Sequence, residues 1–352
     1  MEASHRWLAL LKGEKTDRIP NVPMCAGHCA KIMGMPNLGD YYSKPKFSYK
    51  AQVVTRELYN YDQPPFMMDP GYGCEVWGGK TILPYNPKMG APIPAEPACK
   101  TVDDLDKLEV PDPRTGAWMP EFREMVKLCV DNKQMPMVVI FGGWITSTAP
   151  MIVSIEDFMM WLIEEPDLAK KALKLSTEFG LNLAESFVED FGTDTWIPWD
   201  PNPTDSNVLI DVNMFKEFPL PNVKKLHKGM LDMGLPLIWT HWCSDHNQTM
   251  EAGLIEEIPN GENGILSFGP EVPMDVQAKR FGDNYNLMGN INPPLIMTAE
   301  YDEWQDLCLK NIEEGKDMKK VYSLCVGCEL PPPSPPSNVF GMTQACEKYG
   351  KY

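Results

Sequence analysis

The residues of this chain best suited to chemistry are a histidine and a cysteine two positions apart, followed much later by two further cysteines. His241 and Cys243 come directly after one apolar run, and Cys325 and Cys328 come after another. Residues two apart in an extended chain point to the same side. Imidazole and thiolate are preferred zinc ligands, and three protein ligands leave a fourth position open for a substrate. The pattern therefore favours a metal site built on His241, Cys243 and a cysteine of the later pair.

The spacing alone leaves other interpretations open. The histidine can cap its strand while the cysteines serve as small buried apolar residues. If all four side chains bind one metal, the site is structural and the chain is an acidic metal-binding protein rather than an enzyme. A redox role for the Cys325-x-x-Cys328 pair is disfavoured, because such pairs open a helix and a proline-rich segment, 331–336, follows here.

The elements that must position these residues alternate regularly from residue 136 onward. Short apolar runs that read as buried strands are separated by amphipathic helices, which is typical of parallel βα units. The expected strands are 136–141, 195–199, 235–240, 264–268, 285–289 and 321–324. Polar and metal-capable residues follow successive strands, and in a barrel such loops converge on one face. We therefore expect an α/β fold, a (β/α)₈ TIM barrel, in preference to a doubly wound sheet.

The barrel is expected to form a single domain over 1–352. Residues 1–135 are rich in Pro and Gly and read as an irregular N-terminal extension, whereas 136–352 carry the regular βα units. No Gly-x-Gly-x-x-Gly follows a strand and no Walker loop occurs, so the sequence gives no support for a nucleotide site.

Charge and composition exclude several classes of partner. The chain has 352 residues, 43% of them hydrophobic, and 32 Lys+Arg against 49 Asp+Glu give a formal net charge of −17. Such a surface repels phosphate backbones and anionic lipids, so we expect neither nucleic-acid nor membrane binding. No apolar run reaches the roughly 20 residues of a membrane span. The start shows no secretion signal, so a cytoplasmic location is expected, with most of the ten cysteines free.

Several short motifs, in their order along the chain, resemble the uroporphyrinogen decarboxylase-like superfamily. They are Arg-Ile-Pro at 18–20, Glu-Val-Trp-Gly at 75–78, Pro-Leu-Pro at 219–221, Thr-His-Trp-Cys at 240–243, Gly-Asn-Ile-Asn-Pro at 289–293 and Gly-Cys-Glu-Leu-Pro-Pro at 327–332. The closest resemblance is to the corrinoid-dependent methyltransferase branch, which includes methylcobamide methyltransferases and O-demethylase methyltransferases. The decarboxylases carry an arginine-rich segment near the N-terminus, and the matching stretch here, 24–31, contains no arginine.

The resemblance implies a barrel with a zinc ion on His241, Cys243 and Cys328, which leaves Cys325 as a spare. It also implies a corrinoid, and because the sequence has no Asp-x-His-x-x-Gly motif we expect a partner corrinoid protein to present it. Zinc would activate a small substrate as a Lewis acid. In one direction a thiol takes a methyl group from methyl-cobalt(III); in the other, cobalt(I) takes it from a methyl ether.

The remaining candidate residues concern the substrate. Four tryptophans at or just past strand ends suggest an aromatic wall, and the turn at 289–293 adds an amide. These substrate-binding candidates are Trp144, Trp196, Trp199, Trp242 and Asn290. The wall favours an aryl methyl ether and hence O-demethylation. The alternative is a methyl-corrinoid:thiol methyltransferase of the coenzyme M type, because the His-x-Cys…Cys pattern resembles thiol-methylating members; decarboxylation of a porphyrinogen is a third, weaker reading.

Three carboxylates are expected to assist the chemistry. Asp69, Glu75 and Asp200 lie near the motifs or strand ends described above. Each can move a proton, or orient His241 from behind. An ordinary solvated or helix-capping role is the competing interpretation for each of them.

Overall fold

A parallel sheet forms the centre of the molecule. The computed structural model describes residues 1–66, 72–86 and 89–352. Its six parallel strands follow one another in chain order, β3-β4-β5-β6-β7-β8. They are β3 (Met137–Val139), β4 (Ile197–Pro201), β5 (Trp239–Trp242), β6 (Ile265–Phe268), β7 (Asn286–Ile291) and β8 (Tyr322–Val326). Each corresponds to an expected strand, although β5 begins at Trp239, four residues later than expected.

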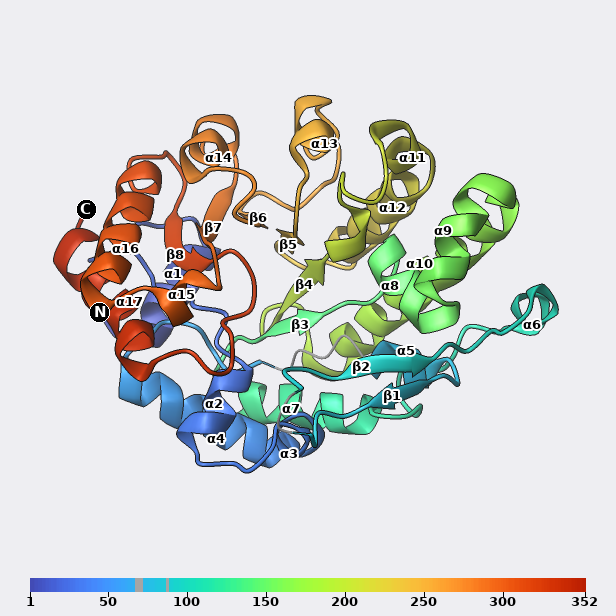
Figure 1. The fold of residues 1–352 in the computed structure, drawn as a ribbon, viewed down its shortest axis with the longest axis horizontal. Helices are drawn as coiled ribbons and strands as arrows, with labels where there is room; N and C mark the ends of the chain where they lie inside the picture. Colours follow the sequence, from blue (N-terminus) through green and yellow to red (C-terminus); the bar gives the residue numbers. More distant parts are fainter. Residues whose placement is uncertain (67–71, 87–88) are drawn as a thin grey trace.

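Helices cover the outside of the sheet, as Figure 1 shows for α9 to α14 and α16. Each crossover between neighbouring strands carries at least one helix, which is the arrangement that parallel strands require. The helices in the crossovers are α8 (Ile145–Ile152), α9 (Ile155–Glu164), α10 (Pro166–Phe191), α11 (Val212–Glu217), α12 (Pro219–Asp232), α13 (Asn247–Glu251), α14 (Met274–Phe281), α15 (Leu295–Thr298) and α16 (Tyr301–Gly315), with a short 3₁₀ turn η1 (Pro203–Asp205) after β4. Helix α17 (Pro336–Tyr349) follows the last strand.

The N-terminal part is more regular than the sequence suggested. It contains α1 (Ala3–Leu11), α2 (Gly27–Ile32), α3 (Gly39–Ser43), α4 (Pro45–Tyr59), α5 (Tyr72–Val76), α6 (Val102–Lys107) and α7 (Met119–Asp131), with the antiparallel hairpin β1 (Lys80–Ile82) and β2 (Ile93–Glu96). Helices α2, α4 and α7 lie together at the lower edge of Figure 1. The expectation of an irregular extension is therefore corrected for these described segments, because Pro and Gly lie mainly between the helices rather than within them.

Two extended segments continue the sheet beyond β8. Asn21 forms a parallel bridge with Leu324 of β8, and the backbone N–H of Asp62 donates to the Asn21 carbonyl at 2.8 Å. Pro64 and Pro65 then remove two backbone donors. In the described residues no backbone hydrogen bond links this second segment to β3. The fold is thus the expected α/β barrel, with its first two strand positions held by short extended segments.

The interior is mainly apolar, with a minority of buried polar side chains. Every residue of β3, β5, β6, β7 and β8 is buried, as is typical of parallel strands that are covered on both faces. One hydrophobic cluster runs from Trp7 to Cys346. In the described ranges no helix combines the length and apolar character needed to cross a bilayer.

Gly142, shortly after β3, allows a close approach between this strand end and helix α10. Its φ is +152°, and a Cβ at this position would overlap the carbonyl oxygen of Ser176 on α10 and lie 3.2 Å from the Gly180 Cα. A side chain here would therefore force α10 away from the sheet, because helix backbone cannot yield locally.

We predict that Gly142→Ala lowers the free energy of unfolding by about 1–3 kcal/mol, which is the usual cost of overpacking. Urea denaturation monitored by circular dichroism measures this change. Gly90→Ala serves as the matched control, because a Cβ there meets nothing within 4 Å. Equal stability of the two variants would contradict the packing described here.

Candidate metal centre

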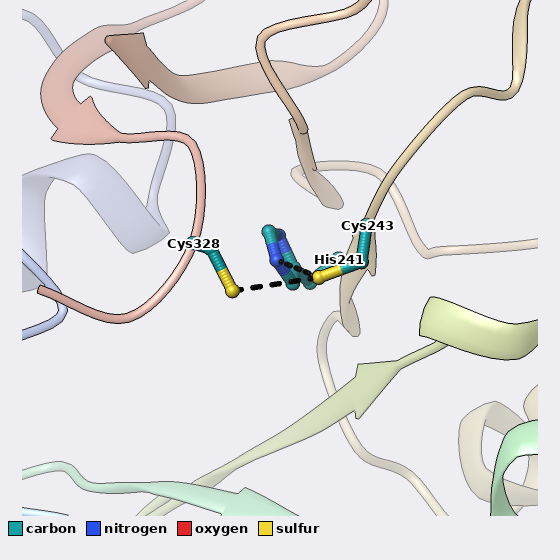
Figure 2. Close-up of side chains that lie close together, drawn as sticks. All are labelled: His241, Cys243 and Cys328. Atoms are coloured by element: carbon teal, nitrogen blue, oxygen red, sulfur yellow. Dashed lines mark hydrogen bonds between the residues drawn. The ribbon is translucent and has the colours of Figure 1, made fainter. Parts of the chain in front are cut away.

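Three potential metal ligands converge at the carboxyl ends of two strands. His241 lies in β5, and Cys243 is the first residue after this strand. Cys328 lies two residues beyond β8. The Cys243 Sγ is 2.8 Å from His241 Nε2 and 3.6 Å from the Cys328 Sγ. All three ligand atoms lie within 4.8 Å of one another. Figure 2 shows the side chains pointing toward a common point from two segments, the end of β5 and the loop after β8.

The alternation of β5 explains why its histidine and cysteine share a side. Successive side chains of a strand point to opposite faces. His241 and Cys243 therefore face the interior of the barrel, whereas Trp242 between them packs outward against Phe215 of α11 and the ring of Phe268. The His-x-Cys pattern in an extended chain therefore places two potential ligands on the same side.

A serine fixes the orientation of the imidazole. Ser267 of β6 stands directly beside His241 in the register of the sheet, and its Oγ is 2.8 Å from the His241 Nδ1. The indole N–H of Trp239 donates to the same Oγ at 2.7 Å. When the Nδ1–H donates to this oxygen, Nε2 keeps its lone pair and faces the cysteine sulfur. From the sequence, carboxylates were expected in this orienting role, and no pattern pointed to Ser267.

The two sulfurs are electrostatically coupled. The hydrogen bond from the Cys243 thiol lowers the pKa of Cys328 well below its usual range, and His241 acts in the same direction. The same bond, together with burial, raises the pKa of the Cys243 thiol. A cysteine binds metal as the thiolate, so the centre already favours one sulfur in the ligating form.

The donor set fits zinc. In a tetrahedral site, zinc–sulfur bonds of ~2.3 Å place two sulfurs ~3.8 Å apart, which is close to the observed 3.6 Å. The nitrogen–sulfur separation of 2.8 Å is shorter than the ~3.6 Å that a shared zinc would set. Imidazole and thiolate are among the commonest zinc ligands, and this group offers one imidazole and two thiols.

Cys325 is not a member of this group. It lies within β8 and is fully buried, and burial raises the pKa of its thiol far above the usual value. Among the described residues, the group of potential ligands contains only the three side chains in Figure 2. A metal held by these three side chains would keep an open fourth position, as catalytic sites do, whereas a structural site has four protein ligands.

A cavity of about 240 Å³ lies against the three ligands. Most of its walls are apolar, and they come from the ends of β3, β4 and β5, from α8 and from the loop after β8. The lining residues are Met24, Val139, Ile140, Phe141, Thr146, Ser147, Met151, Trp199, Pro201, Pro203, His241, Cys243, Cys328 and Glu329. A small substrate in this space would contact the centre directly.

The expected aromatic wall is reduced to one tryptophan. Trp199 lines the cavity, with its ring centroid 6.5 Å from that of His241. Trp144 and Trp242 instead pack edge to face with each other at 5.5 Å, between the sheet and the helices. Trp196 donates to a backbone carbonyl at the end of α10. These three residues belong to the core, because they lie on the outward faces of the strands or beyond the strand ends.

The structure also places the other expected residues away from the cavity. The Asp200 carboxylate accepts hydrogen bonds from His227 at 2.7 Å and Trp144 at 2.5 Å, behind the sheet. Glu75 accepts the backbone N–H of Thr81 at 3.0 Å, and so holds the turn into β1. The amide of Asn290 donates to two backbone carbonyls of the loop after β6. Asp69 lies outside the described residues.

The carboxyl group that does reach the cavity is Glu329, which the sequence analysis did not single out. It directly follows Cys328 and accepts the backbone N–H of Gly27 at 3.1 Å. Burial raises its pKa to about 7. Its position beside a predicted ligand was the only sequence signal that pointed to it.

Metal content tests the membership of the centre. We predict one zinc per chain in the wild-type protein, and loss of this zinc in Cys328→Ala, because two remaining ligands bind it weakly. Cys325→Ala, three residues away on the same segment, retains it. Elemental analysis after dialysis measures the zinc. Retention in Cys328→Ala, or loss in Cys325→Ala, would mean that the wrong cysteine has been chosen.

The role of Ser267 is tested separately. We predict that Ser267→Ala weakens zinc binding about 10–100-fold, which is the usual effect of removing a group that orients a metal-bound histidine. Competition with a chromophoric chelator measures the affinity. Ser323→Ala removes a buried hydroxyl that bonds only a backbone carbonyl of β7, and serves as the control. Unchanged affinity in Ser267→Ala would remove the serine from the centre.

Comparisons with known proteins identify the family of this chain. The family description "Uroporphyrinogen decarboxylase (URO-D)" matches residues 2–349. Two proteins named methylcobamide:CoM methyltransferase MtaA, from Methanosarcina barkeri strain Fusaro and from Methanosarcina barkeri, are each 26% identical to the chain, over 98% of it and 97% of their own length. A solved methyltransferase from Methanosarcina mazei is 20% identical, covers 99% of both chains and has a TM-score of 0.81, so it shares the fold. The predicted resemblance is confirmed, and these names agree with its corrinoid-dependent branch: the chain belongs to the uroporphyrinogen decarboxylase family.

Proposed function

We propose that this chain is a corrinoid-dependent methyltransferase that moves a methyl group from a methylated corrinoid, presented by a partner protein, to a small thiol. The observation that carries the proposal is the group of three potential metal ligands, which would leave a fourth position open, against a mostly apolar cavity. The relatives that match nearly the whole chain are named for methyl transfer between a methylcobamide and coenzyme M, which is a thiol.

The proposal replaces the aryl methyl ether that the tryptophans had suggested. Of the four tryptophans, only Trp199 lines the cavity. Trp144 and Trp242 pack against each other behind the sheet. The relatives are named for a thiol rather than an ether, and a histidine with two cysteines is the pattern that resembled thiol-methylating members. Both observations favour the alternative over O-demethylation.

The residues of the centre would hold zinc and prepare it for a thiol. His241, Cys243 and Cys328 would be the ligands, with the imidazole oriented by Ser267. When bound, zinc would lower the pKa of a thiol in the open position and keep it as the thiolate at neutral pH. The apolar walls exclude water from the sulfur, which preserves its nucleophilicity.

The methyl transfer itself is a displacement at carbon. The thiolate attacks the methyl group of methyl-cobalt(III), a carbon–sulfur bond forms, and the cobalt–carbon bond breaks with its electron pair left on cobalt(I). The proton of the thiol leaves to solvent when the thiolate forms. The corrinoid acts as a substrate in this step and must approach over the carboxyl ends of the strands, where active sites of barrels lie.

An assay with free methylcobalamin and a panel of small thiols tests the proposal. We predict formation of the methyl thioether and of cob(I)alamin, followed anaerobically by its visible spectrum. Cys243→Ser or a zinc chelator should lower the rate about 100-fold or more, because several kcal/mol of activation are lost. Cys325→Ala is the control that keeps the rate.

Two results would contradict the proposal. One is an unchanged cobalamin spectrum with every thiol. The other is activity that survives removal of the metal. Methylation of cob(I)alamin by phenyl methyl ethers, with no reaction of thiols, would instead support O-demethylation as the function.

A further inference from the structure

In the described part of the chain, the lining of the cavity beside the metal centre offers an anionic substrate no Lys or Arg. Its walls are Met24, Val139, Ile140, Phe141, Met151 and Trp199, together with two prolines. No Lys or Arg occurs among the described lining residues, and the one basic side chain, His241, belongs to the centre.

The polar groups of the lining are already used by the protein. The Thr146 hydroxyl donates to Asp205 at 2.9 Å and accepts the backbone N–H of Thr204 at 2.7 Å. The Ser147 hydroxyl accepts the backbone N–H of Gly142 at 3.0 Å and donates to the Trp144 carbonyl at 3.3 Å. Neither hydroxyl is free to replace the hydration of a charged group.

The helix N-terminus on the α8 side of the cavity is also closed to an anion. Helix α8 begins at the cavity, but Asp205 accepts its first two backbone N–H groups, from Ile145 at 2.9 Å and from Thr146 at 3.0 Å. A carboxylate of the protein thus occupies the position in which a helix end would bind a ligand anion. Glu329, the remaining polar group of the lining, is an acceptor and brings no positive charge.

The entry of an anionic substrate into this cavity would be strongly unfavourable in free energy. Removing an ion from water without a counter-charge costs several kcal/mol, even after the protein relaxes. An uncharged alkyl or aryl body instead gains by leaving water. The cavity, at about 240 Å³, is below the ~300–1,000 Å³ of typical ligand pockets, so the substrate is small.

We infer that the thiol methylated by this chain is small, uncharged and largely apolar. The inference rests on the proposed function and departs from the relatives' named acceptor, because coenzyme M carries a sulfonate. The cavity would select its substrate because it has no counter-charge for an ionic group, and not because it adds a contact to the preferred thiol. A substrate whose charged group stays unpaired is rejected more strongly than an apolar substrate that fits poorly.

Three thiols of similar size and different charge test the inference with the zinc-loaded protein and free methylcobalamin. They are 1-propanethiol, 2-mercaptoethanesulfonate and cysteamine, which are neutral, anionic and cationic. We expect kcat/KM for 1-propanethiol to exceed that for 2-mercaptoethanesulfonate about 100-fold or more, as an unpaired ion in an apolar site implies.

A substitution that supplies the missing charge gives a second readout. Met151→Lys places an ammonium group on a chain of similar length in the cavity wall, and should shift the ratio of the two rate constants toward the sulfonate about 10-fold or more. Met151→Leu is the neutral control and should leave the ratio unchanged. The ratio in the wild-type protein decides the matter on its own if Met151→Lys does not fold.

The outcomes separate this inference from the proposed function. If no thiol is methylated, the proposed function fails and the inference falls with it. If thiols are methylated but 2-mercaptoethanesulfonate or cysteamine reacts as well as 1-propanethiol or better, the inference alone is wrong.

Discussion

The close approach of two sulfurs from different strands is the constraint on which the site depends. Cys243 follows β5 and Cys328 follows β8, and these strands are three places apart in the sheet. In a flat sheet, three spacings of ~4.8 Å would separate them by ~14 Å. Their sulfurs are 3.6 Å apart. The sheet must therefore curve until the loops after its strands meet, and the barrel is what turns scattered cysteines into one centre.

The two faces of the strands have different roles. The inward face carries His241, Trp199 and the apolar walls of the cavity. The outward face carries Asp200, which binds His227 of α12 and Trp144 and so ties the helices to the sheet. A buried carboxylate with two hydrogen-bonding partners stabilises this layer, because an unpaired one would be costly. Chemistry and packing thus occupy opposite sides of the same short strands.

The sequence predicted the strands and the three side chains that the structure brings together, because both depend on local patterns. Apolar runs bounded by Pro and Gly mark strands, and a His-x-Cys pair needs only extended chain to share a side. It could not predict which tryptophan faces inward, since a shift of one residue turns every side chain of a strand over, and Trp199 and Asp200 differ by one such step. Ser267 gave no signal, because its partner is a neighbour in space and lies on another strand.

The most direct test of an open metal site that receives a thiol is zinc X-ray absorption spectroscopy of the purified protein. The account predicts two sulfur neighbours at ~2.3 Å and one nitrogen at ~2.0–2.1 Å, with a light atom in the fourth place. Addition of 1-propanethiol should replace that light atom with a third sulfur. Four protein sulfurs or nitrogens before the thiol is added, or no new sulfur afterwards, would contradict the account.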